Sequence, residues 1–428
     1  MRDVVIVEGV RTPYIKAGTL FNDIPAQELG RIAVSELLVK TSLDPELIDE
    51  VVIGNIAQPA EAANIARVIA LMAGIPRKVP AFTVCRNCAS GMESIANAYL
   101  KIAAGEADVV IAGGVESMSN IPLLYPKEFA NVMAEMARAK TVGQKVAALT
   151  KVRVQHLKPI IGLQVGLTDP ICDLNMGQTA EVLAKEFLIS REEQDQFALM
   201  SHQRATNATD LGKLREEIVP VYPPPNFDKV VDEDNGIRKN QTMEALAKLR
   251  PVFDREFGTV TAGNSSQITD GAAAVLVMSA EKARELGYEP LGYVRSYAFA
   301  GLDPKRMGLG PAYATPKALK KAGVQFKEIQ LIEMNEAFAA QVIANEKVFR
   351  EKKLAQDRLG LDDAIGEIDR EILNVNGGAI ALGHPVGSSG TRIVLTLLKE
   401  MKRRDLTLGL ATLCVGGGQG GAMIVERK

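Results

Sequence analysis

The stretch Phe82-Thr-Val-Cys-Arg-Asn-Cys88-Ala-Ser-Gly91 is the centre of this chain. Its first residues are apolar and prone to form strands, and a pattern typical of a helix runs from Met92 to Ala104. The stretch therefore predicts a strand that delivers Cys88 to the start of a helix. Unpaired N–H groups and the positive end of the helix dipole favour a thiolate at that position. Cys88 is thus a candidate nucleophile, and the alternative is an inert cysteine of the core.

The composition is that of a soluble globular protein. The chain has 428 residues, of which 47% are hydrophobic and 24% charged, so it is long enough for two or three domains. A net charge of −2 with both signs scattered gives no basis for a nucleic-acid partner. Four irregularly spaced cysteines do not form a disulfide scaffold. With no leader-like sequence and no apolar run of about 20 residues, we expect a cytoplasmic protein without a membrane span.

Strand-like and helix-like segments alternate on both sides of a less regular middle part. This alternation is typical of βαβ units and predicts an α/β fold with a largely parallel sheet. The flanks share one pattern, which indicates two similar halves. Strands are expected at residues 4–10, 50–56, 82–84, 108–112, 273–278, 291–298, 331–333, 372–375, 406–414 and 422–426, and helices at 25–39, 62–72, 90–104, 315–322, 337–349 and 388–401.

The middle part, residues 119–250, is predicted to be an inserted loop domain. The N-terminal half would then comprise residues 1–118 completed by 251–279, and the C-terminal half residues 280–428. Within the insertion, Lys127–Lys158 holds seven Lys or Arg against two Glu, and the apolar segment Pro159–Leu167 follows. This pattern fits a solvated helical excursion with one buried face. It also fits a basic and apolar surface for an anionic ligand, a partner or a membrane.

Four short segments combine reactive or polar residues with small ones, each near the end of a predicted strand. Sites of α/β proteins form at such strand ends. Among the three histidines, His384 is held between Gly383 and Pro385, as a base beside a thiol would need to be, although a purely structural turn is the alternative. His202 is expected to be a surface or packing residue, and His156 to be solvated. The four segments are Cys88-Ala-Ser-Gly91, Asn335-Glu-Ala-Phe338, Gly383-His-Pro-Val-Gly-Ser-Ser-Gly390 and Cys414-Val-Gly-Gly-Gly418.

Cys85 and Cys88 form a C-x-x-C pair, which is compatible with a redox pair or with half of a zinc site. Neither is favoured, because the chain has no second pair, no suitably spaced histidine and no compact thioredoxin-like context. We therefore predict no metal site. Redox control of Cys88 through Cys85 stays open as a weaker hypothesis.

In this order, the four segments resemble those of the thiolases (acetyl-CoA C-acyltransferases). The resemblance runs from Val4 to Glu426 and includes Gly113-Gly-Val-Glu-Ser-Met118 and Ala262-Gly-Asn-Ser-Ser266. It implies the thiolase fold, in which two similar βαβ-type halves pack as αβαβα layers with an inserted loop domain that binds coenzyme A.

The resemblance also implies a reaction, which is thiolytic cleavage of a 3-ketoacyl-CoA or the reverse condensation of two acyl-CoA molecules. Cys88 would carry the acyl group, His384 would take its proton, and Cys414 would exchange a proton with the α-carbon of acetyl-CoA. Backbone N–H groups of Cys88 and Gly416 would stabilise one oxyanion, and His384 with a water held by Asn335 the other. Coenzyme A is then a substrate, and no tightly bound cofactor is expected.

Motif matching places Arg238 near the phosphates of coenzyme A, and the alternative for each residue of this group is ordinary packing. The substrate signals are mixed. Asn175 stands where short-chain biosynthetic thiolases often have histidine, and residues 350–370 look like thiolases of fatty-acid degradation, whereas residues 383–390 are close to acetoacetyl-CoA thiolases. The pantetheine and acyl path is expected to be lined by Met176, Phe253, Ala262, Ser266, Ala337 and Phe338.

The resemblance further implies a homodimer or homotetramer. A hydratase/dehydrogenase subunit and peripheral contact with a membrane are possible partners, because some of the similar proteins are β-subunits of trifunctional complexes. The alternative function is accordingly a thiolase subunit whose main role is assembly into a β-oxidation complex. A condensing enzyme that uses an acyl carrier protein is disfavoured, since such enzymes carry a second histidine where this chain has Cys414.

Overall fold

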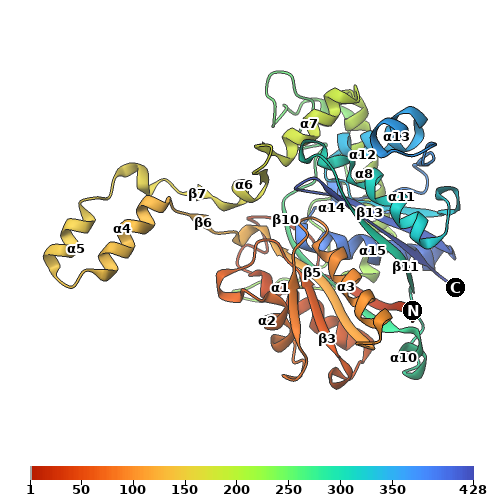
Figure 1. Ribbon diagram of the computed structural model, residues 1–428, viewed down its shortest axis with the longest axis horizontal. Helices are drawn as coiled ribbons and strands as arrows, with labels where there is room; N and C mark the ends of the chain where they lie inside the picture. Colours follow the sequence, from red (N-terminus) through yellow and green to blue (C-terminus); the bar gives the residue numbers. More distant parts are fainter. Residues whose placement is uncertain (1) are drawn as a thin grey trace. The chain divides into compact units, whose positions relative to one another are not determined.

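The computed structural model describes residues 2–428, which form two compact units. The larger unit contains residues up to 120 and from 169 onward, and the smaller one contains Ile121–Thr168. The larger unit is built on a ten-stranded sheet, in which nine strands follow the order β12-β13-β14-β11-β1-β10-β5-β3-β4 and the short β2 pairs with β10 (Figure 1). Its strands are β1 (Val4–Arg11), β2 (Ile15–Lys16), β3 (Glu50–Gly54), β4 (Ala81–Val84), β5 (Val109–Ser117), β10 (Thr269–Ser279), β11 (Gly292–Gly301), β12 (Leu331–Met334), β13 (Leu408–Val415) and β14 (Gln419–Glu426).

The sheet repeats one pattern of pairing in its two halves. In the N-terminal half β3 pairs in parallel with β4 and β5, while β10 pairs antiparallel with β5 and with β1. In the C-terminal half β12 and β13 are parallel, while β14 pairs antiparallel with β13 and with β11. The halves meet where β1 and β11 pair antiparallel through Val5 with Tyr293 and Ile6 with Gly292. The expectation of two similar halves is thus confirmed.

The expectation of a largely parallel sheet is wrong, because most neighbouring strands along the path are antiparallel. The alternation rule assumes a helical crossover between successive strands. Here β13 and β14 are joined by the tight turn Gly416–Gly418, and such a hairpin connection forces antiparallel pairing. The predicted strand at 372–375 is also absent. Only Leu373 makes a parallel bridge, to Ile332, because Asn374 adopts a left-handed backbone with φ 46°.

Helices of both halves cover the sheet (Figure 1). These helices are α1 (Ala26–Thr41), α2 (Ile65–Met72), α3 (Ser90–Ala104), α11 (Gly310–Ala322), α12 (Ala339–Arg350) and α15 (Val386–Arg404). The larger unit also has α7 (Met176–Glu186), α8 (Arg191–Asp210), α9 (Met243–Ala247), α10 (Ala280–Glu285), α13 (Lys352–Leu359), α14 (Ala379–Leu382) and β9 (Leu174–Asn175), with β8 (Thr168–Asp169) at the boundary.

Three apolar clusters set the order of the layers. One joins α1 and α2 to the N-terminal strands, and another joins α11 and α12 to the C-terminal strands. The third joins α3 and α15 to strands of both halves. Along β3, Val51 and Ile53 lie in the first cluster and Val52 in the third, as expected for side chains that alternate between faces. The layers therefore follow the predicted order of helix, sheet, helix, sheet, helix, with α3 and α15 shared in the middle.

The two central helices come closest at their N-terminal ends. A Cβ atom on Gly91 of α3 would lie 2.6 Å from Thr391 Oγ1 and 2.9 Å from the Gly387 carbonyl oxygen of α15. Thr391 donates a hydrogen bond of 3.0 Å to the Gly91 carbonyl. On the neighbouring strand β5, Gly114 also has no room for a Cβ against Gly387. The chain segments that precede both helices are thereby brought to one place.

The smaller unit is shorter than the predicted insertion at 119–250. Residues after 168 belong to the larger unit because Leu183 of α7 and Phe197 of α8 enter its core. The smaller unit consists of β6 (Leu123–Leu124), α4 (Lys127–Arg138), α5 (Val142–Leu149), β7 (Ile160–Ile161) and α6 (Gly162–Gly166), with β6 and β7 antiparallel. It holds eleven of the exposed large apolar side chains found between residues 2 and 428. No helix in the same range is long and apolar enough to cross a membrane.

Replacing Gly91 with alanine should destabilise the protein by about 1–3 kcal/mol, because the new methyl group overlaps the backbone of α15. Gly143→Ala is the matched control, since Gly143 lies in α5 with no atom near its Cβ position. It should change stability by less than about 1 kcal/mol. Equal shifts of the two variants in denaturant unfolding would contradict the close approach of α3 and α15.

Candidate active site

Cys88 lies in the turn that links β4 to α3, as predicted. The turn is fixed by hydrogen bonds of 2.9 Å from the Ala89 and Ser90 N–H groups to the carbonyls of Arg86 and Asn87. Asn87 has a left-handed backbone with φ 43°, which asparagine tolerates better than most residues. This conformation reverses the chain and leaves the Cys88 side chain partly exposed, two residues before the first residue of α3.

The protein around Cys88 acts against the thiolate that the helix position alone favours, although part of the residue's surface is exposed. Burial raises the pKa of Cys88, and the negative charge of Glu116 acts in the same direction. Hydrogen bonding to the backbone N–H groups of Gly416 and of Cys88 itself partly offsets these effects. Because desolvation is the largest influence, the environment of Cys88 favours the thiol over the thiolate.

His384 is the candidate base that the sequence predicts. It follows α14 and precedes α15, and its backbone N–H donates a 3.1 Å hydrogen bond to the Gln267 carbonyl. Its Nδ1 lies 2.6 Å from Ser389 Oγ, and its Nε2 lies 3.4 Å from the Asn335 amide nitrogen. Burial lowers the pKa of His384 to about 3, and the positive charge of Arg392 contributes. The ring is therefore neutral at physiological pH and can accept a proton.

Asn335 follows β12 and reaches the same place from the C-terminal half. Its N–H donates to the Thr412 carbonyl at 2.9 Å, which extends the pairing of β12 with β13 by one residue. Its side chain is buried, and Oδ1 has no hydrogen-bond partner among residues 2–428. A buried amide oxygen of this kind is available to a water molecule or a substrate group.

Cys414 and Gly416 lie at the end of β13. Cys414 is fully buried, and burial together with the neighbouring Cys88 raises the pKa of its thiol. The Gly416 carbonyl accepts a 2.7 Å hydrogen bond from the Asn87 side chain, which ties this turn to the Cys88 turn. A Cβ on Gly416 would come within 3.2 Å of Met176 Sδ. The two thiols and the Gly416 N–H therefore converge.

The structure brings together several of the residues predicted to line the substrate path. Cys414 shares one apolar cluster with Met176, Phe253, Ala337 and Phe338. The rings of Phe253 and Phe338 are 6.1 Å apart, edge to face. Ser266 donates a 2.9 Å backbone hydrogen bond to Ala337. Next to Phe253 a cleft of about 510 Å³ is lined by Gln178, Glu181, Val182, Lys185, Asp254, Arg255 and Glu256.

Arg238 and Ala262 are exposed and lie outside this cluster. The Arg238 N–H donates a 3.2 Å hydrogen bond to Nδ1 of His202. His202 is a buried packing residue, and burial lowers its pKa to about 4. His156, expected to be solvated, is also buried, which corrects that expectation.

Sequence analysis missed two buried carboxylates that shape the site. Glu116, whose pKa burial raises to about 7, accepts a 3.1 Å hydrogen bond from the N–H of Gly387 in the first turn of α15. Glu336, next to Asn335, accepts a hydrogen bond of 2.6 Å from Ser201. Both lie inside the motifs that carry the resemblance. A charged residue among small and apolar neighbours in such a motif could have indicated a buried carboxylate near the site.

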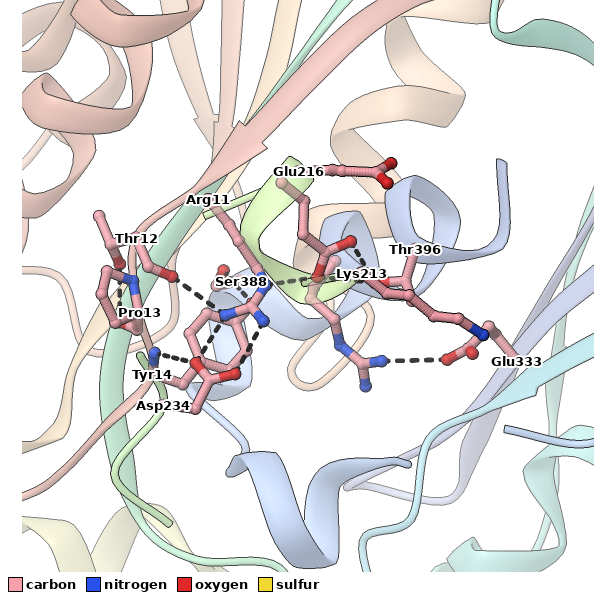
Figure 2. A network of polar contacts seen from close by, with 12 residues as sticks. Arg11, Thr12, Pro13, Tyr14, Lys213, Glu216, Asp234, Glu333, Ser388 and Thr396 are labelled. Carbon is pink, nitrogen blue, oxygen red and sulfur yellow. Dashed lines mark hydrogen bonds and ion pairs between the residues drawn. The ribbon is translucent and has the colours of Figure 1, made fainter. Parts of the chain in front are cut away.

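A third missed feature is a network around Arg11, shown in Figure 2. Arg11 makes two hydrogen bonds to Asp234, of 2.7 and 2.8 Å, and one of 2.7 Å to Glu217. Glu217 in turn accepts a hydrogen bond from Thr396 of α15. The network joins the end of β1 to α15, the helix that follows His384.

Comparison with known proteins identifies the class. Models of the thiolase N-terminal and C-terminal domains match residues 4–281 and 288–427, so the chain belongs to the thiolase family. It is 46% identical over 424 residues to proteins named 3-ketoacyl-CoA thiolase from Yersinia enterocolitica and Pectobacterium atrosepticum, covering 99% of this chain and 96% of each relative. The predicted family and fold are confirmed.

Solved structures agree with this assignment. The Bacillus anthracis acetyl-CoA acetyltransferase superimposes with a TM-score of 0.86 at 38% identity, covering 100% of this chain and 99% of that one. Human mitochondrial 3-ketoacyl-CoA thiolase in complex with CoA gives 0.84 at 37% identity, covering 100% and 98%.

The protonation state of Cys88 can be tested by alkylation. The thiolate is the reactive form, and burial raises the pKa of Cys88 above the ordinary cysteine pKa of about 8.5. The rate of Cys88 alkylation by iodoacetamide should therefore still increase above about pH 8.5. Trypsin cleaves after Lys78, Arg86 and Lys101, so Cys85 and Cys88 fall in separate peptides for mass spectrometry. A Cys88 rate that is already constant from pH 6 upward would indicate a thiolate–imidazolium pair instead.

Proposed function

We propose that this protein is a 3-ketoacyl-CoA thiolase that works through an acyl-Cys88 intermediate. The observation that carries the proposal is that the Cys88 turn meets the end of β13, where Cys414 and Gly416 lie, while His384 precedes α15, whose first turn packs against α3. The names of the most similar relatives favour 3-ketoacyl-CoA as the substrate and thiolytic cleavage as the direction.

In the first half-reaction, Cys88 Sγ attacks the 3-keto carbon while its proton passes to His384. The bond between C2 and C3 then breaks, which leaves an acyl thioester on Cys88 and the enolate of acetyl-CoA. The enolate takes a proton from Cys414 and departs as acetyl-CoA. The raised pKa of Cys414 suits this step, because the thiol keeps its proton until a strongly basic carbon appears.

In the second half-reaction, the thiol of coenzyme A attacks acyl-Cys88 and gives its proton to the Cys414 thiolate. Cys88 leaves as acyl-CoA forms, and it recovers the proton held by His384. The oxyanion of one half-reaction would be stabilised by the backbone N–H groups of Cys88 and Gly416. That of the other would be stabilised by His384 together with a water bound to Asn335, whose buried Oδ1 has no partner in the described chain.

Coenzyme A would enter along the apolar cluster that contains Met176, Phe253, Ala337 and Phe338. Ser266 and Ala262 lie on the segment that borders it, and Arg238, which is exposed, would contact the phosphates. A similar solved thiolase was crystallised with CoA, which supports coenzyme A as the substrate of this site. We further propose a cytoplasmic enzyme that forms a homodimer or homotetramer.

Cys88→Ala should reduce the CoA-dependent cleavage of 3-ketoacyl-CoA by at least about 10³-fold, because no acyl thioester can form. Cys85→Ala is the matched control, since this exposed cysteine lies three residues away and the mechanism does not use it. Rates measured against 3-ketoacyl-CoA substrates of increasing chain length would also define the acyl preference. Cleavage that survives in Cys88→Ala would refute the proposed function.

A second candidate function is assembly into a β-oxidation complex through the smaller unit. This unit carries seven Lys or Arg against two Glu, and its exposed apolar side chains include Val142 at 79% and Val154 at 88% exposure. Such a surface suits a hydratase/dehydrogenase subunit or, by peripheral contact, a membrane.

The variant Val142→Asp, Val154→Asp should abolish co-sedimentation with a hydratase/dehydrogenase subunit while leaving thiolase activity intact. Val39→Asp is the control, because Val39 is 72% exposed on α1 of the larger unit. If the subunit still binds the double variant but not Val39→Asp, the smaller unit is not the attachment site. Flotation with anionic lipid vesicles would show whether a membrane binds instead.

A further inference from the structure

We propose that Ser389 is a positioning residue that holds His384 in the tautomer with a proton on Nδ1, so that Nε2 is free to accept the proton of Cys88. The inference rests on the proposed function for the role of Nε2, but the tautomer itself can be measured without any reaction. It concerns a serine that neither the motif resemblance nor the chemistry above assigns to any task.

The hydrogen bonds of Ser389 determine the direction of the contact with the ring. Ser389 is fully buried in the first turn of α15, and its Oγ lies 2.6 Å from Nδ1 of His384. The same hydroxyl donates a hydrogen bond of 3.2 Å to the carbonyl of Pro385. A hydroxyl group has one proton to donate. We assign that proton to the bond with Pro385, which makes Nδ1–H the donor and Oγ the acceptor of the short contact.

The opposite edge of the ring agrees with this assignment. Nε2 lies 3.4 Å from the amide nitrogen of Asn335, and an amide NH₂ group can only donate. A bare Nε2 is therefore the matching partner. The contact is long for a hydrogen bond, so the lone pair of Nε2 is held only weakly and remains available to an incoming proton.

Serine also differs from the carboxylate that often orients a catalytic histidine. A carboxylate at Nδ1 favours the imidazolium form, as in Ser-His-Asp triads. Here the acceptor at Nδ1 is neutral, and the charged group that acts on the ring is Arg392, which disfavours a second positive charge. Ser389 thus fixes the orientation and tautomer of the ring without making it more basic. Such a ring returns the proton readily in the second half-reaction.

The adjacent serine provides a matched control. Ser388 is as buried as Ser389, but its Oγ lies 2.7 Å from the Tyr14 hydroxyl, as Figure 2 shows. Tyr14 connects in turn to the Arg11 network, because its N–H donates a 2.6 Å hydrogen bond to Asp234. Two consecutive serine hydroxyls of one helical turn therefore have different partners. Ser389 contacts the imidazole of His384, and Ser388 contacts the hydroxyl of Tyr14.

The other two histidines supply an internal contrast. Nδ1 of His202 accepts a 3.2 Å hydrogen bond from the N–H of Arg238, and Nδ1 of His156 accepts one of 3.3 Å from the N–H of Arg153. Neither nitrogen can then carry a proton in the neutral ring. Both of these histidines should be Nε2–H tautomers, whereas His384 should be Nδ1–H.

The first test is long-range ¹H–¹⁵N correlation NMR of the full-length protein labelled with ¹⁵N-histidine. At pH 7.5 we expect one Nδ1–H ring, assigned by its disappearance in His384→Ala, and two Nε2–H rings. In Ser389→Ala the His384 signal should become that of a tautomer mixture, and in Ser388→Ala it should stay unchanged. An Nε2–H ring at His384 in the unmodified protein would overturn the proposal.

The second test is kinetic. Ser389→Ala should lower kcat by about 10–100-fold with the KM for 3-ketoacyl-CoA changed less than about twofold, because the ring is misoriented while the binding surface is intact. Ser388→Ala should lower the thermal unfolding midpoint and keep kcat within about threefold. Equal losses of kcat in both variants would refute a specific role of Ser389. If the unmodified protein cleaved no 3-ketoacyl-CoA, the proposed function would fail, and the NMR result would still decide the tautomer.

Discussion

The close contact between the first turns of α3 and α15 is the constraint on which the site depends. Gly91 and Gly387 let the two backbones approach, and Thr391 closes the contact with a hydrogen bond to the Gly91 carbonyl. Cys88 lies two residues before the first residue of α3, and His384 lies two residues before the first residue of α15. The proposed nucleophile and base thus come from different halves of the chain, and helix packing in the middle layer sets the position of the segments that carry them.

Burial and buried charges act together on the residues of the site. Burial raises the pKa of both thiols and lowers that of the imidazole, with contributions from Glu116 at Cys88 and from Arg392 at His384. Buried ion pairs are found in the pair of Arg392 with Glu333 at 3.0 Å and in the network of Arg11. Such buried pairs contribute little net stability, but breaking one is costly because it leaves an uncompensated buried charge. Here they connect α15 to β12 through Arg392 and Glu333, and to the end of β1 through Glu217 and Arg11.

Local signals explain what the sequence could predict. The strand, cysteine and helix around Cys88 are contiguous, and the resemblance supplied Met176, Phe253, Ala337 and Phe338, which the structure gathers with Cys414. Antiparallel pairing could not be derived, because alternation of strands and helices carries no information about the order of strands in the sheet. The same holds for contacts that join distant residues.

Two residues show why contacts between residues distant in the sequence could not be predicted. At Asn374 the side chain takes the place of a backbone strand partner. Its Oδ1 accepts a 2.8 Å hydrogen bond from the Met334 N–H, and its amide nitrogen donates one of 2.8 Å to the Met334 carbonyl. The apolar pattern of residues 372–375 does not indicate that a side chain would make these hydrogen bonds in place of the backbone. Ser389 likewise lies in a segment of small residues whose pattern fits any tightly packed helix. Its role becomes visible only when the partner of His384 Nδ1 is known.

The repeated half explains why two helix N-termini meet at the site. The segment from β4 to α3 in one half corresponds to the segment from Leu373 to α15 in the other, since Leu373 bridges β12 as β4 pairs with β3. Packing the equivalent helices against each other therefore places two positive dipole ends beside the reacting groups. At rest this field is insufficient to ionise the Cys88 thiol, because desolvation outweighs it. In the proposed reaction the negative charge would move onto the substrate oxygen, where the same preorganised dipoles would stabilise it without further rearrangement.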